Sequence, residues 1–168
     1  MSNIFVTGGT GYIGQRLIPE LIRRGHTVRA LVRSEKKLPA GAIAVRGNAL
    51  DASTFADQVA PSDTFVQLVG VAHPSPSKAE EFRQIDLVSV RESVSAARGA
   101  GVKHFVYLSV VQPAPIMRDY VAVRAEGESL IRPMACGSSS SRTSRSALAP
   151  LAGRGWPLRL RSGQAAAG

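Results

Sequence analysis

Cysteine is almost absent from this 168-residue sequence, in which Cys136 is the only one. A single thiol forms neither an intramolecular disulfide nor a cysteine cluster for a metal ion. Long apolar runs are missing as well, and none approaches the roughly 18 residues that a membrane-spanning helix needs. The opening stretch, MSNIFVTGG, lacks the basic leader and long apolar core of a secretory signal peptide. We therefore expect a cytoplasmic protein with no membrane span and no metal site.

Acidic side chains are missing from the last part of the sequence. Residues 1–132 carry 16 Lys and Arg and all 12 Asp and Glu, whereas residues 133–168 carry five Arg and no acid. More than half of the net charge of +9 therefore comes from the last fifth of the chain. A basic nucleic-acid-binding protein is favoured only by this local charge, and no recognisable nucleic-acid-binding module accompanies it. We expect no nucleic acid partner.

The same segment, 133–168, also lacks Ile, Val, Phe and Tyr and is rich in Ser, Ala, Gly, Arg and Pro. Such a composition buries too little apolar surface to offset chain entropy, so we predict a disordered, basic, low-complexity tail. Residues 1–132 are then the single folded domain. Two origins of the tail stay open, because a reading-frame shift near residues 132–137 of a GC-rich gene gives the same composition as a genuine disordered tail.

Strand-like and helix-like patterns alternate through residue 132, which predicts an α/β fold with a parallel sheet and helices on both faces. The expected strands are residues 3–6, 26–33, 42–48, 64–70 and 103–110. The expected helices are residues 12–25, about 78–98 and 118–132, and a further short helix is expected within residues 49–63.

A glycine-rich turn joins the first strand to the first helix, with the sequence TGGTGYIG at residues 7–14. In a strand–turn–helix context, Gly8 allows a tight turn, Gly11 lets the backbone approach a pyrophosphate, and Gly14 lets the helix pack closely on the strand. The helix N-terminus then offers free N–H groups to phosphates. The other candidate phosphate-binding residues of the turn are Thr10, Tyr12 and Ile13. A glycine-rich turn without a ligand is the alternative.

This fingerprint resembles that of the extended and atypical short-chain dehydrogenase/reductase superfamily, and in particular its NAD(P)H-binding, NmrA-like and epimerase/dehydratase-like members. The resemblance covers residues 1–132 and implies a Rossmann-like, doubly wound parallel sheet of about five strands that binds NAD(P)(H). It further implies a substrate region after residue 132, which is not recognisable here, so the chain resembles a truncated member with an unknown small-molecule substrate. A homodimer through the helices after strands 4 and 5 is implied by the resemblance alone.

The residues at the ends of the second, third and fourth strands bear on the cofactor. Arg33 ends strand 2, where an arginine favours NADP(H), through its 2′-phosphate, over NAD(H). NAD(H) remains the alternative because the acidic Glu35 lies two residues later. By the resemblance, Asn48 and Ala49 stand where an acidic stretch commonly meets the adenine, and Val69 and Gly70 form the segment that passes beneath the cofactor.

The superfamily's chemistry uses a Ser after strand 5 and a Tyr-x-x-x-Lys pair on the next helix. Here Ser109 fits the serine and Tyr120 fits the tyrosine, but Arg124 replaces the lysine and Asp86 stands where members often carry Asn. A guanidinium retains the charge but is never deprotonated, so a lysine-like proton relay is lost. An amphipathic helix without catalytic residues is the alternative for this segment. The resemblance thus implies an NADP-dependent oxidoreductase or epimerase/dehydratase relative, and a non-catalytic NADP(H)-sensing regulator of the NmrA type remains the alternative.

Overall fold

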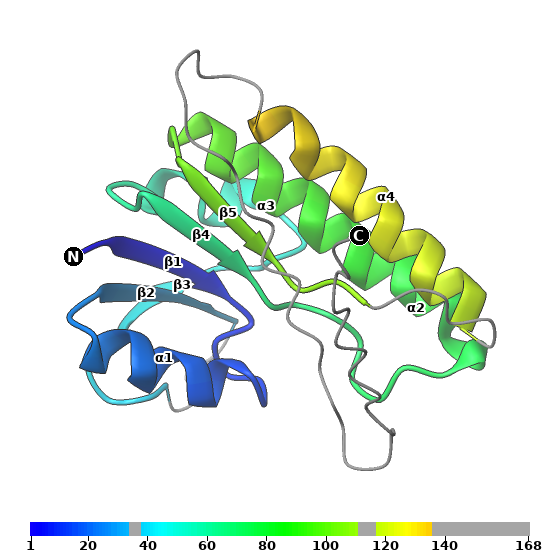
Figure 1. The fold of residues 1–168 in the computed structure, drawn as a ribbon, viewed down its shortest axis with the longest axis horizontal. Helices are drawn as coiled ribbons and strands as arrows, with labels where there is room; N and C mark the ends of the chain where they lie inside the picture. The colour runs from blue at the N-terminus through cyan, green and yellow to red at the C-terminus, as the bar shows by residue number, and fades with distance from the viewer. Residues whose placement is uncertain (34–37, 111–116, 136–168) are drawn as a thin grey trace, which may run out of the picture.

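The computed structural model describes residues 1–33, 38–110 and 117–135. Five strands form one parallel sheet in the order β3-β2-β1-β4-β5 (Figure 1). The strands are β1 (Asn3–Thr7), β2 (Thr27–Val32), β3 (Ile43–Arg46), β4 (Thr64–Gln67) and β5 (His104–Tyr107). The predicted parallel sheet of five strands is confirmed.

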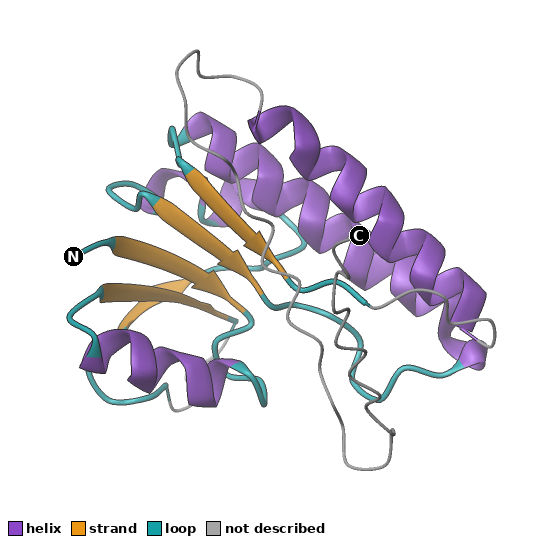
Figure 2. Ribbon diagram, viewed as in Figure 1, coloured by secondary structure: helices purple, strands orange, loops and turns teal. Residues whose placement is uncertain are grey.

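The helices cover both faces of this sheet, as the alternating pattern predicts (Figures 1 and 2). The α-helices are α1 (Gly14–Arg23), α2 (Ala79–Glu81), α3 (Val88–Gly99) and α4 (Arg118–Ala135). Helix α1 packs on one face, and α3 packs on the other with α4 alongside it. Helix α4 continues beyond residue 132, and the rest of the predicted tail, 136–168, lies outside the described residues.

Two apolar clusters, one on each face, hold the layers together. On the α1 face the buried residues are Ile4, Val6, Ile18, Val28, Ala30 and Val66. On the α3 face they are Phe5, Leu31, Val45, Ala49, Phe55, Val59, Phe65, Ala96 and Ala97. Successive side chains of a strand point to opposite faces, so the central strands are apolar on both sides and read as continuous apolar runs.

Two segments differ from the expected helices. The long helix expected over residues 78–98 consists of a 3₁₀ turn (Pro76–Lys78), the short α2, a π-helical segment (Phe82–Leu87) and α3. The short helix expected between β3 and β4 is a pair of 3₁₀ turns, Ala52–Thr54 and Ala56–Gln58. The carboxylate of Asp51 caps the first of these turns by accepting the N–H of Ser53 at 3.0 Å.

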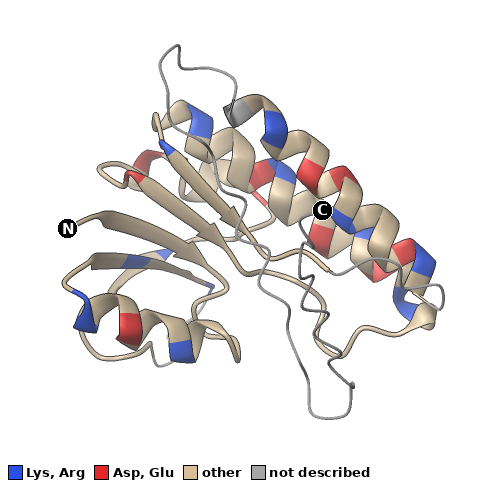
Figure 3. Ribbon diagram, in the orientation of Figure 1, with Lys and Arg blue, Asp and Glu red and all other residues tan. Residues whose placement is uncertain are grey.

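The order of the strands defines where a ligand is expected. The chain runs outward from β1 through β2 to β3 and then returns to the other side of β1 for β4 and β5. In open α/β sheets, ligands bind outside the carboxyl ends of the strands at such a switch point, which here lies between β1 and β4. Charged residues of both signs are distributed along α3 and α4 (Figure 3).

Candidate functional site

The glycine-rich turn lies at the switch point, in contact with the end of β4. Gly8 has a φ of +76°, which L side chains rarely adopt, and a Cβ there would lie 2.8 Å from the carbonyl carbon of Leu68. The N–H of Leu68 also donates to the carbonyl of Thr7 at 3.1 Å. The turn after β1 and the segment after β4 are therefore neighbours, as a site between the two strands requires.

The later glycines of the turn allow close approaches of the backbone. A Cβ at Gly14 would lie 2.4 Å from the carbonyl oxygen of Gly9, so only glycine lets α1 begin this close to the turn. Gly11 donates its N–H to the carbonyl of Gly8 at 3.0 Å, and a Cβ on it would lie 3.2 Å from that same oxygen. Gly11 is exposed, so a side chain there would project over the open mouth of the turn.

Helix α1 begins without a partner for its first N–H groups. Among the described residues, the backbone N–H groups of Tyr12, Ile13 and Gly14 have no hydrogen-bond acceptor. No side chain of the described residues caps this end of α1, and the first turn of α1 contains no acidic residue. A glycine cradle with free N–H groups at the positive end of a helix dipole fits the diphosphate of a dinucleotide.

The ends of β2 and β3 lie together beside this cradle. The N–H of Gly47 donates to the carbonyl of Val32 at 3.0 Å, which brings the stretches that begin with Arg33 and Asn48 side by side. Arg33 is exposed, so its charge is available to a ligand. The side-chain oxygen of Asn48 accepts the N–H of Leu50 at 3.1 Å, which leaves its amide donors free among the described residues. Ala49 is buried in the core, and Glu35 lies outside the described residues.

The segment after β4 is fixed by hydrogen bonds to buried polar side chains. The buried amide of Gln67 donates to the carbonyl of Val69 at 3.2 Å and to the hydroxyl of Ser89 at 2.9 Å. The carboxylate of Asp86 accepts the N–H of Val71 at 2.9 Å. Gly70, between these anchors, is exposed, and a Cβ there would lie 2.6 Å from Nη2 of Arg124.

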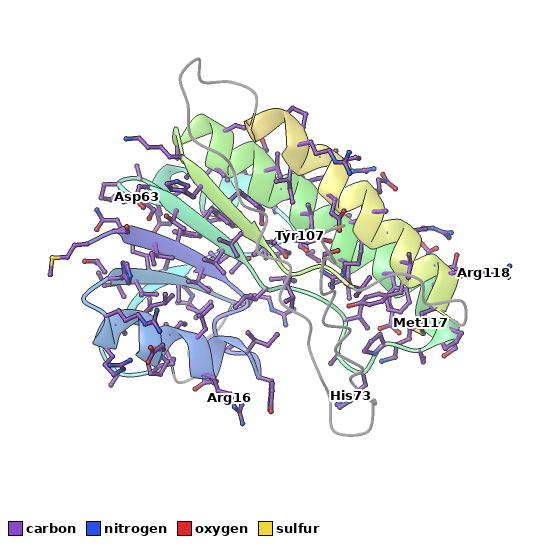
Figure 4. All side chains as sticks on the ribbon, in the orientation of Figure 1. Arg16, Asp63, His73, Tyr107, Met117 and Arg118 are labelled. Carbon is purple, nitrogen blue, oxygen red and sulfur yellow. The ribbon has the colours of Figure 1, made fainter. Side chains whose placement is uncertain are left out.

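Arg124 lies in a buried polar cluster rather than on an open surface. It is 4 % exposed, and its Nη2 donates to the fully buried carboxylate of Asp86. Its Nη1 donates to the carbonyl of Leu108 at 3.0 Å and to the hydroxyl of Tyr107 at 3.3 Å. Figure 4 shows Tyr107 where the end of β5 meets the long helices.

Burial sets the protonation of this cluster. It raises the pKa of Asp86 above its usual range, and the charge of Arg124 and the N–H of Val71 offset part of that rise. Burial also lowers the pKa of Arg124, but the oxygens of Tyr107, Tyr120 and Asp86 raise it by more, so the guanidinium stays charged. Burial raises the pKa of Tyr107, which keeps its hydroxyl protonated.

The three predicted catalytic residues have different contacts in the structure. The ring of Tyr120 packs on Phe82 with centroids 4.9 Å apart, and the guanidinium carbon of Arg124 lies 5.0 Å from the Tyr120 centroid. Ser109, after β5, donates its hydroxyl to the carboxylate of Glu128 instead. The structure therefore brings Tyr120 and Arg124 together and pairs Ser109 with a residue that sequence reasoning missed.

Asp86 departs from the family pattern, and its position in the sequence also indicates a buried partner. Asp86 lies four residues after the buried Phe82 and three before the buried Ser89. A charged residue within an apolar stripe of a helix indicates a buried partner, because an unpaired buried charge is costly. Glu128 gives no comparable signal, since its partner comes from a distant strand end.

Comparison with known proteins gives a family and several relatives. The NAD(P)H-binding family matches residues 8–127. A ketoreductase of a farnesylated dihydroquinoline oxide from Stigmatella aurantiaca is 34 % identical over 109 residues, which are 62 % of this chain and 32 % of the relative. The 3-beta-hydroxysteroid dehydrogenase of Mycolicibacterium neoaurum is 33 % identical over 119 residues, 64 % of this chain and 31 % of the relative. This chain thus spans about a third of the length of these curated relatives.

Solved structures share the fold. The Bordetella bronchiseptica enzyme WbmH, in complex with NAD+, aligns with a TM-score of 0.64 at 19 % identity over 80 % of this chain and 52 % of its own. Within the described residues, no helix has the length and apolar character to cross a membrane. The same residues contain no group of three or more His, Cys, Asp or Glu that could hold a metal ion.

Proposed function

Because this chain belongs to the NAD(P)H-binding family, we propose that its glycine turn binds the diphosphate of a nicotinamide dinucleotide at the β1–β4 switch point. The observation that carries this proposal is that the N–H groups of Tyr12, Ile13 and Gly14 have no acceptor among residues 1–33, 38–110 and 117–135. These groups lie at a turn whose close backbone contacts only glycines allow. Gly8, Thr10 and Gly11 complete the predicted phosphate-binding turn.

The two halves of the dinucleotide would then extend to opposite sides of β1. The adenosine half would lie toward β2 and β3, where Arg33 follows β2 and Asn48 and Ala49 follow β3. Arg33 is exposed directly after β2, where we place the adenosine ribose, and its charge would favour the 2′-phosphate of NADP(H) over the hydroxyl of NAD(H). The nicotinamide half would lie over the ends of β4 and β5, next to Val69 and Gly70.

We further propose an oxidoreductase reaction on a carbonyl or secondary alcohol, since the relatives reported above are a ketoreductase and a dehydrogenase. The bound nicotinamide supplies or accepts a hydride in such chemistry. Tyr120 is the candidate proton donor to the substrate oxygen, and Ser109 is the candidate hydrogen-bond partner of that oxygen. Arg124 is the third predicted residue, and its positive charge lies close to Tyr120, with the guanidinium carbon 5.0 Å from the ring centroid. Neither relative favours a non-catalytic NmrA-type regulator over this proposal.

A fluorescence titration of the purified chain with NADPH and with NADH tests the cofactor proposal. We expect nicotinamide fluorescence to rise on binding and the affinity for NADPH to exceed that for NADH. Binding of neither dinucleotide by folded protein would refute the proposed function, and tighter binding of NADH would refute only the proposed role of Arg33.

The catalytic part needs a separate test. We expect the chain, given NADPH and a panel of ketones, to show turnover that Tyr120→Phe abolishes while NADPH binding is retained. Turnover that survives Tyr120→Phe would remove Tyr120 from the mechanism. Binding without turnover on any ketone would instead favour the regulator.

The remaining expectations concern partners and location. The helices after strands 4 and 5 are α3 and α4, and we propose that they form a homodimer interface in the cytoplasm, with no nucleic acid partner. Light scattering after size-exclusion chromatography tests the dimer, and a monomeric mass at micromolar concentration would refute it.

A further inference from the structure

The guanidinium of Arg124 connects two strand ends. From α4, Arg124 donates Nη1 to the carbonyl of Leu108, directly after β5, at 3.0 Å. Its Nη2 donates to Asp86, whose other carboxylate oxygen accepts the N–H of Val71, after β4, at 2.9 Å. The segments after β4 and β5 are therefore fixed to the same side chain.

Asp86 reaches this position from the π-helical segment Phe82–Leu87. Wide turns of this kind occur frequently at functional sites, where they redirect a side chain that a regular helix would place elsewhere. Asp86 is fully buried, and both of its carboxylate oxygens are used, one by Arg124 and one by the backbone of Val71. The pair is thus a closed link between the π-helical segment, α4 and the two strand ends.

The pair also determines why residue 70 is a glycine. A Cβ at Gly70 would lie 2.6 Å from Nη2 of Arg124 and 3.1 Å from Oδ1 of Asp86. The exposed backbone of Gly70 therefore covers the buried guanidinium. Any group bound over the end of β4 would meet the backbone of this segment, with Arg124 behind it.

We infer that Arg124 is a positioning residue: with Asp86, it fixes the segments after β4 and β5 and thereby shapes the nicotinamide half of the dinucleotide site. This inference rests on the proposed function, because that proposal places the nicotinamide half over these strand ends. Among the described residues, neither side chain of the pair makes a hydrogen bond to β1, β2, β3 or the start of α1, which would hold the adenosine and diphosphate half. The two halves of the ligand must therefore respond differently when the pair is removed.

The test compares the affinities of NADPH and of 2′,5′-ADP, which lacks the nicotinamide half, by calorimetry on the full chain. If the wild type prefers NADH, NADH and ADP replace them. The variants are Arg124→Met and the double variant Asp86→Asn/Arg124→Met, which leaves no unpaired buried charge. The matched control is Arg91→Met, which removes an exposed arginine of α3 that pairs with Glu126 of α4 at 2.8 Å.

We expect either Arg124 variant to weaken NADPH binding by about tenfold or more and to change 2′,5′-ADP binding by less than about twofold. The control should bind both ligands as the wild type does. Equal weakening of both ligands, or no change in either, would overturn the inference and leave Arg124 a purely structural residue. Loss of a cooperative thermal melt in both Arg124 variants would overturn it in the same way. If the wild type binds neither ligand, the proposed function itself fails.

Discussion

The contact between Gly14 and Gly9 permits a quantitative prediction for Gly14→Ala. The added methyl would lie 2.4 Å from the carbonyl oxygen of Gly9 and 2.6 Å from its Cα. Because both contacting atoms belong to the backbone, the clash is removed only if the start of α1 moves away from the glycine turn by about 1 Å. Overpacking of this kind costs about 3 kcal/mol, which lowers the melting temperature of a domain of this size by about 10 °C.

Thermal melts followed by circular dichroism provide the assay, with Gly99→Ala as the matched control. Gly99 ends α3, and a Cβ there would meet nothing within 4 Å. Alanine is the better helix former, so this control should melt at or slightly above the wild-type temperature. If Gly14→Ala melts as high as Gly99→Ala, then α1 does not pack on the turn as described and the close-approach reasoning is wrong.

Three further predictions follow from other contacts. Arg33→Ala should weaken NADPH and leave NADH unchanged in fluorescence titrations, and an equal loss for both would remove Arg33 from the 2′-phosphate site. The carboxylate of Asp63 accepts the N–H of Asn3 at 3.2 Å. Burial raises the pKa of Asp63, but hydrogen bonds from the hydroxyl of the following threonine and from the N–H of Asn3 lower it, and the net effect is a lowered pKa. The ionised Asp63 therefore stabilises the fold above its ordinary pKa, and this contribution is lost as the pH falls through the lowered pKa. In thermal melts, the difference in melting temperature between the wild type and Asp63→Asn should shrink as the pH drops from about 6 to about 3. A difference that stays constant over this range would contradict the prediction. Glu128→Leu removes the acceptor of the Ser109 hydroxyl and should cost about 1.5 kcal/mol in urea unfolding, with partial rescue by Glu128→Gln; the absence of any cost would show that this bond is not made in solution.

Much of the fold could be predicted because its determinants are local. The parallel sheet with helices on both faces follows from the alternation of strands and helices. The glycine turn is recognised from the spacing of its glycines between a strand and a helix. The π-helical segment could not be predicted in this way. Its apolar stripe is continuous with that of α3, and the residue that distinguishes it, Asp86, is buried against a partner 38 positions later in the chain.

The same distinction between neighbouring and distant residues applies to the candidate site. The geometry of the glycine turn depends on neighbouring residues, so its position between β1 and α1 could be predicted from the sequence. The Tyr-x-x-x-Arg spacing places Tyr120 and Arg124 on one helical face, and the guanidinium carbon of Arg124 lies 5.0 Å from the centroid of the Tyr120 ring. What spacing cannot supply is the direction in which a long side chain points. Arg124 turns toward β5 and Asp86, and Ser109 toward Glu128, because of acceptors contributed by other elements of the fold.

The central claim is that free backbone N–H groups of the first turn hold a dinucleotide diphosphate, and calorimetry on Gly11→Val tests it most directly. A Cβ at Gly11 would lie 3.2 Å from the carbonyl oxygen of Gly8, a contact that a small shift relieves, so the variant should remain folded. We predict binding heat for the wild type with NADPH or NADH and at least about tenfold weaker binding for the variant, because its side chain projects over the cradle. Folded wild-type protein that gives no heat with either dinucleotide, or a variant that binds like the wild type, would contradict the claim.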